Sequence, residues 1–350
     1  MGTTAKRAAV ATLVAGGILV LALALWKVKV VIALFFLGMI IAAAMRPGID
    51  WLQRHARIPR GLGVLIHFAA LAGLVALFLW LIVPPAISQV QQAIGGSALH
   101  HEAVHSSGFK HEILSSLDKR LRNLPSGSKL LHPAITVTKT AFEVLVGIFF
   151  MFAVAAYWIF ERDNTIALVQ SLSPRKHRRV VRDTWILIDH KLGAFVRGEA
   201  LLIVFVAAVL SAGFWLIGLP YWLLVGTFAG VFELIPIIGP LAAGAVAVGI
   251  GLTQSWQMGL YAGLIVLVVR QLEDYLIVPR VMGHAVGLSP LVVLTSVTTI
   301  GILFGGFYVL VAIPIAAVLA TLVDVVLRDV DPAEQEVPTV LFPGAKEEAG

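Results

Sequence analysis

One ionisable side chain lies inside a long apolar stretch, next to residues that interrupt a helix. Glu233 follows an apolar run and precedes Pro236, Gly239 and Pro240. Proline removes a backbone donor and glycine adopts angles that other residues resist, so we expect no continuous helix here. A charge within an apolar segment is costly and marks a binding site by default. We predict that these four residues bind a ligand or ion; the alternative is a surface loop with Glu233 at its edge.

A second charged group follows about forty residues later, at Arg270, Gln271, Glu273 and Asp274. On a helix, Arg270 reaches Glu273 at i+3 and Asp274 at i+4. One carboxylate neutralises Arg270, which leaves the other for a cation, a proton or Arg280. We predict that Gln271, Glu273 and Asp274 contact the ligand, whereas Arg270 is a structural ion-pair partner. The alternative is that the whole group only holds helices together.

A third stretch of the chain combines charge with helix-breaking residues. It runs from Pro279 and Arg280 through Gly283 and His284 to Pro290, so a continuous helix is not expected. It forms either a re-entrant turn or a plain loop. We assign Pro279, Arg280, Gly283 and Pro290 to the binding site. A single loop histidine is more often solvated than functional, so His284 is left out.

The composition indicates that these groups lie in a membrane protein. Of 350 residues, 59% are hydrophobic and only 13% are charged. A soluble domain has about a quarter charged residues, and a soluble surface this apolar would aggregate. The net charge is +6, but the basic residues lie in short segments between apolar runs, which is the pattern of membrane proteins and excludes nucleic-acid binding. No cysteine is present, so disulfides and thiolate metal sites are excluded.

The fold class that follows is an all-α polytopic membrane protein with about eight transmembrane helices, some broken or re-entrant. The first apolar run, 8–25, resembles a signal peptide, but a second run follows at once, which favours an uncleaved span. We expect five segments. N-terminal transmembrane helices occupy 1–85, and an amphipathic, extracytoplasmic surface region follows at 86–140. A fourth span with a basic cytoplasmic interfacial helix lies at 141–199, a transmembrane transport core at 200–327 and a disordered cytoplasmic tail at 328–350.

Arginine-rich turns predict the orientation of the chain. Basic residues at the N-terminus, in the turn at 46–60 and in the cluster at 175–182 all fall on one side if 86–140 lies on the other. Because basic loops stay in the cytoplasm, both termini are expected there, in the inner (cytoplasmic) membrane of a cell.

Two motifs resemble those of the autoinducer-2 exporter family. The first is Ile235–Pro240, and the second runs from Arg270 through Pro279 and Leu288-Ser289-Pro290 to Phe304-Gly305 and Ala312-Ile313-Pro314. The order of apolar segments also agrees, so the resemblance covers about residues 10–327. The chain departs from the family pattern at Ser289, where many members have histidine, and at Tyr308-Val309, where a second glycine is usual. Both departures concern the identity of the substrate more than the fold.

The resemblance implies eight spans, a surface region between the third and fourth, a homo-oligomer that is a pentamer, and an elevator-like movement of the motif-bearing part. Members are linked to export of the quorum signal autoinducer-2, and others to sodium/proton antiport. We expect a secondary transporter that exports a small polar organic molecule.

Two alternatives remain, a cation/proton antiporter using Na⁺ or H⁺ and a non-transporting membrane scaffold. No nucleophile–base pair, phosphate loop or metal-site spacing indicates an enzyme, a cofactor or a metal.

Overall fold

The computed structural model describes residues 2–95, 131–236, 238–281, 287–335 and 337, and these residues are helical with short connections. The predicted all-α membrane fold is confirmed. By length and composition, five helical stretches can each cross a membrane, and shorter apolar helices accompany them. The helices are α1 Gly2–Lys27, α2 Lys29–Ala56, α3 Arg60–Gly95, α6 Leu131–Leu172, α7 Arg178–Leu216, α8 Trp222–Phe232, α9 Ile238–Gln254, α10 Trp256–Leu272, α11 Val278–Val281, α12 Pro290–Phe304 and α13 Ala312–Leu327.

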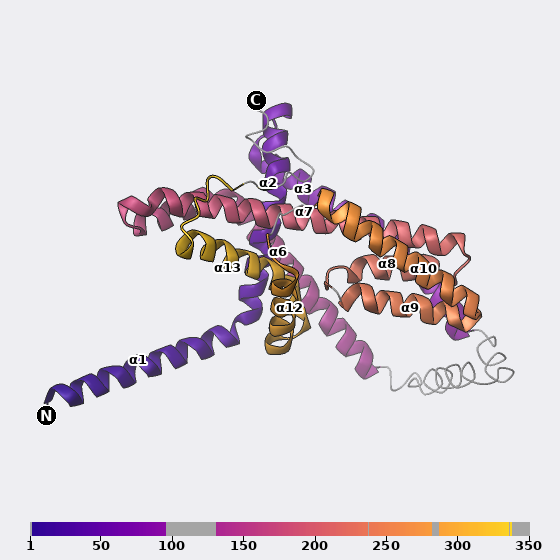
Figure 1. Ribbon diagram of the computed structural model, residues 1–350, viewed down its shortest axis with the longest axis horizontal. Helices are drawn as coiled ribbons and strands as arrows, with labels where there is room; N and C mark the ends of the chain where they lie inside the picture. Colours follow the sequence, from indigo (N-terminus) through magenta and orange to yellow (C-terminus); the bar gives the residue numbers. More distant parts are fainter. Residues whose placement is uncertain (1, 96–130, 237, 282–286, 336, 338–350) are drawn as a thin grey trace.

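Helix α7 organises the molecule (Figure 1). Its C-terminal half packs along α8 and α10, while α9 packs against α10. Its N-terminal half contacts α2, α6 and α13. The predicted boundary at residue 199 falls inside α7, because no glycine–proline break separates the basic segment from the apolar one, so the two form one continuous helix.

Two of the apolar clusters among the described residues lie near opposite halves of α7. One joins α7 to α8, α9 and α10 through small and branched residues such as Val206, Ala229, Ala243 and Ala262. The other joins α2, α3 and α6. Small residues permit close helix packing within each core, as is usual between membrane helices. We call these two groups of helices units; the first includes the C-terminal half of α7, and α2 and α6 of the second contact α7.

The last apolar stretch bends at Gly305-Gly306. Gly305 has φ of 101°, a conformation that favours glycine, and a 3₁₀ segment η4, Gly306–Val311, leads into α13. Helix α12 begins with Ser289 as N-cap and Pro290 in its first turn. The bend lets α12 and α13 contact each other.

The ends of two predicted segments are ordered in the structure. Helix α3 continues to Gly95 and α6 starts at Leu131, so both ends of the region 86–140 are helical, while 96–130 lies outside the described residues. The start of the predicted disordered tail packs on α7, where Lys191 Nζ donates to Gln335 Oε1 at 2.9 Å. For residues 338–350, outside the described part, the prediction of disorder stays a prediction.

Candidate functional site

The structure brings together the first two charged groups of the sequence. Glu233 lies directly after α8, and Arg270 lies in the last turn of α10. Arg270 Nη1 donates to Glu233 Oε1 at 3.0 Å. The same nitrogen lies 3.0 Å from both carboxylate oxygens of Glu273. Arg270 therefore ties the end of α8 to the end of α10.

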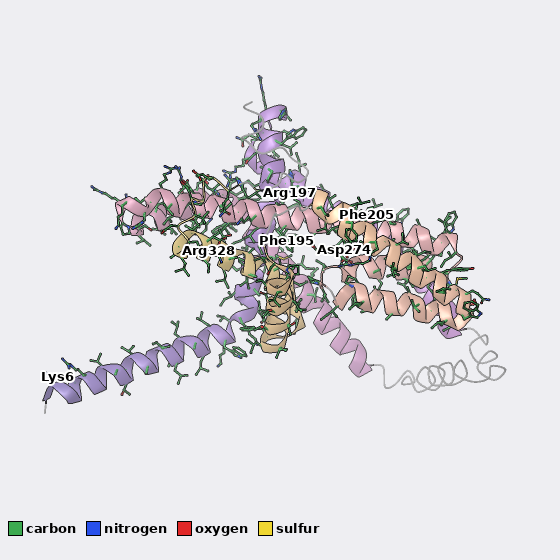
Figure 2. The ribbon with its side chains drawn as sticks, in the orientation of Figure 1. Lys6, Phe195, Arg197, Phe205, Asp274 and Arg328 are labelled. Atoms are coloured by element: carbon green, nitrogen blue, oxygen red, sulfur yellow. The ribbon has the colours of Figure 1, made fainter. Side chains whose placement is uncertain are left out.

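Two acidic residues follow α10 in a π-helical turn, η3, Glu273–Ile277. Such turns are rare and frequently lie at functional sites, because the extra residue changes the direction of the side chains. Glu273 points inward and is 4% exposed, while Asp274 stays at the surface and pairs with Arg270 Nε at 3.4 Å. Figure 2 labels Asp274 on this turn. The turn thus separates one buried carboxylate from one accessible carboxylate.

The buried charges do not balance. Glu233 is 7% exposed, and with Glu273 and Asp274 it faces one guanidinium group. Glu233 and Glu273 both accept a hydrogen bond from the same Arg270 nitrogen, so their carboxylates lie close together. Two carboxylates that share a site repel each other as anions, and one proton shared between them relieves the repulsion. The cluster is suited to sharing a proton.

A cavity of about 20 Å³ adjoins the cluster. One end is polar, formed by Glu233, Arg270 and Glu273, and apolar residues of α7 to α10 form the remaining walls. A cavity of this size holds about one water molecule. It has room for a water or a dehydrated monovalent cation, and not for an organic molecule, in the conformation observed.

The break between α8 and α9 follows from its proline and glycine residues. The last turn of α8 tightens, with Glu233 N bonded to Gly230 O at 3.2 Å and Ile235 N to Phe232 O at 3.0 Å. Pro236 has no N–H with which to continue the helix. Pro240 lies in the first turn of α9 and lines the cavity.

Gly239 is required at this break by a close approach of two backbones. A β-carbon there would clash with the Phe232 carbonyl group. We therefore expect Gly239→Ala to separate the start of α9 from the end of α8, at a cost of about 1–3 kcal/mol typical of overpacking. The midpoint of thermal unfolding in detergent measures this cost. Gly249→Ala in the same helix is the control, because its β-carbon would meet open space; equal effects of the two substitutions would contradict the prediction.

Glu199 joins the cluster although the sequence analysis does not single it out. It lies on α7 on the same helix face as Val206 and Leu210, seven and eleven residues later, which line the cavity. It interacts electrostatically with Glu233 and Glu273. The position of Glu199, directly before the apolar run that starts at residue 200, is the signal in the sequence. It indicates a buried acid only once the basic and apolar segments are known to form one helix.

The remaining predicted site residues lie elsewhere or outside the description. Gln271 is exposed at the end of α10, and its contact with a ligand stays a prediction. Pro279 is exposed in α11, the helix that also carries Arg280, whose side chain lies outside the described part, as does Gly283. Pro290 is exposed at the start of α12.

Helix α12, which follows the stretch from Pro279 to Pro290, packs near the loop that carries Glu233. Ile235, in the loop after Glu233, packs against Val297 of α12 and Val309 of η4. The α12–η4 bend therefore contacts the loop that carries Glu233. Among the residues that the structure describes, no group of three or more His, Asp or Glu side chains is arranged to hold a metal ion.

Known proteins with similar sequences are consistent with a transport function. A family model described as "AI-2E family transporter" matches residues 16–328. The chain is 26% identical to "Putative transport protein YueF" of Bacillus subtilis over 83% of this chain and 84% of that protein. It is 24% identical to "Putative transport protein YrrI" of the same organism over 86% and 88%. It is 27% identical to "Putative permease PerM" of Escherichia coli over 56% and 58%.

Proposed function

We propose, since this chain belongs to the AI-2E family of membrane transporters, that it is a secondary transporter exporting a small polar organic molecule. The chain is a multi-pass membrane protein that acts on a small-molecule substrate within the lipid bilayer. Autoinducer-2 is our first candidate substrate. The proposal includes an inner-membrane homo-oligomer, a pentamer, with both termini in the cytoplasm.

The observation that carries the proposal is the carboxylate cluster joined by Arg270 beside an interrupted helix. Transporters place their binding sites at such interruptions, where freed backbone groups and helix ends contact the ligand or ion. In a segment this apolar, an excess of buried acid requires a positive partner. We assign that partner to a coupling proton or sodium ion held by Glu233 and Glu273.

An elevator-like movement would follow from the division of the fold. The unit formed by α8, α9, α10 and the C-terminal half of α7 has its own apolar core, separate from the core of α2, α3 and α6. Binding of a cation neutralises the cluster and lowers the cost of moving it through the membrane. The organic substrate would enter at the α8–α9 break in a more open conformation, because the cavity observed is too small for it.

The test is export from proteoliposomes loaded with autoinducer-2 under an imposed proton or sodium gradient. We expect Glu233→Gln and Glu273→Gln each to slow gradient-driven export by at least about tenfold, since neither amide can exchange a proton. Asp274→Asn is the matched control, because that carboxylate is 45% exposed and should change the rate by less than about twofold. Export that is unaffected by both glutamine variants would contradict the coupling role.

Cation/proton antiport is the second candidate function, favoured by a cavity sized for an ion and by the excess of carboxylates. The same vesicles without an organic substrate, carrying a pH-sensitive dye, separate the two functions. Sodium-driven proton movement in the absence of autoinducer-2 would support the antiporter. Under either function we expect Glu199→Gln to weaken cation dependence, because it removes a further carboxylate beside Glu233 and Glu273.

A further inference from the structure

Three basic residues that have no partner among the described residues lie where α6 turns into α7. Arg175, Lys176 and His177 form a single 3₁₀ turn, η2, and all three are exposed. Their side chains make no ion pair or hydrogen bond with the residues that the structure describes. Three consecutive basic side chains are therefore exposed on the part of the chain that the structure describes.

The neighbouring cations are already engaged. Arg178 donates to the carbonyl oxygens of Ser171 and Ser173, and so satisfies the end of α6. Arg179 and Arg182 both pair with Asp183. The open positions are thus confined to η2, rather than spread along the whole basic segment.

An apolar surface lies directly beside these cations. Leu168 and Leu172, one turn apart on α6, are largely exposed, with Leu172 at 79%. Val180 in the first turn of α7 is partly exposed as well. Exposed leucines next to lysine and arginine are the composition of surfaces that enter the boundary between headgroups and acyl chains.

The start of α7 adds to the positive field. Its N-cap, His177, makes no side-chain capping bond, and the first turn contains no acidic residue. The free N–H groups of the first turn and the helix dipole favour an anion at this end. In this setting the helix end reinforces the cations of η2.

We propose that this corner, residues Leu168–Val180, binds the phosphate of an anionic phospholipid, with Arg175 and Lys176 on the headgroup and the leucines in the acyl region. The corner joins two candidate membrane spans, Phe142–Leu172 and Arg175–Leu216, so it lies where the chain meets the membrane surface. Anionic lipids attract basic segments at that surface, and the apolar neighbours favour a lipid over a soluble anion.

The test uses the absence of cysteine from the chain. Ser171→Cys places a single thiol in the corner for an environment-sensitive fluorophore. Labelled protein is reconstituted with brominated phosphatidylglycerol or brominated phosphatidylcholine at equal mole fraction. We expect the anionic lipid to quench about fivefold more effectively at low mole fraction. This factor corresponds to the attraction between one basic side chain and an anionic membrane surface.

Two charge variants locate the effect. Arg175→Gln with Lys176→Gln should remove the preference for phosphatidylglycerol. Lys6→Gln with Arg7→Gln removes the same charge from the free end of α1, where Figure 2 labels Lys6, and should preserve the preference. Equal quenching by both lipids, or equal loss in the two double variants, would overturn the proposal. Quenching by neither lipid would place the corner away from the membrane and overturn it as well.

Discussion

Arg270→Met is expected to destabilise the protein by about 3 kcal/mol and to abolish transport. The guanidinium group is the shared partner of Glu233 and Glu273, both nearly inaccessible. Removing it leaves two buried carboxylates without compensation, which is the situation that makes a broken buried pair so costly. We place the cost at the lower end of the usual range because the Arg270 side chain is one-third exposed. The midpoint of thermal unfolding in detergent measures the loss.

A charge-balanced variant separates the two consequences of this substitution. Combining Arg270→Met with Glu233→Gln and Glu273→Gln removes all buried charge, so we expect much of the stability to return while transport stays absent. Arg328→Gln, which removes an exposed ion pair with Asp324, is the control and should cost no more than about 1 kcal/mol. A triple variant as unstable as the single one would show that Arg270 acts by packing rather than by charge.

The second large effect is expected in the other unit, at Asp189. This residue on α7 is buried and forms an ion pair with buried Arg162 of α6. Arg46 of α2 lies 4.0 Å from the same carboxylate. Asp189→Asn keeps the shape but removes the charge that three helices share. We expect a loss of about 3 kcal/mol, measured as a lower unfolding midpoint and a lower yield of folded protein from membranes.

Two comparisons make the Asp189 prediction specific. Asp183→Asn, six residues earlier on α7, removes a carboxylate whose arginine partners are exposed, and should cost no more than about 1 kcal/mol. Arg162→Met with Asp189→Leu replaces the buried pair by apolar groups and should recover most of the stability. Equal costs for Asp183→Asn and Asp189→Asn would mean that burial of the pair does not matter.

Helix α7 carries Asp189 and also lines the cavity beside Arg270, so it connects the two units. Asp189 fixes its N-terminal half to α2 and α6, while Val206 and Leu210 of its C-terminal half line the cavity beside Arg270. Any relative movement of the units must bend or slide this helix. We therefore expect Asp189→Asn to lower stability without removing the cation dependence that the glutamates provide, and the transport assay described above distinguishes these effects.

The sequence by itself determined the membrane class, the broad apolar segments, the break at Pro236–Pro240, and the i+3 and i+4 partners of Arg270. These properties are local, because they depend on the length of apolar runs, on missing backbone donors and on spacing along one helix. The sequence did not predict the contact between Glu233 and Arg270, because spacing along the chain does not report a contact between residues 37 positions apart.

Only the tertiary structure decided that Glu233 contacts Arg270, that Glu199 lies beside the cluster and that Gln271 is exposed. Packing of α8 and α10 against the same half of α7 brings Glu233, Arg270 and Glu273 together, and the continuity of α7 puts Glu199 on their side. The π-helical turn then buries Glu273 and leaves Asp274 exposed. Gln271 follows Arg270 directly, but on a helix adjacent residues point about 100° apart, so it is exposed while its neighbour joins the site.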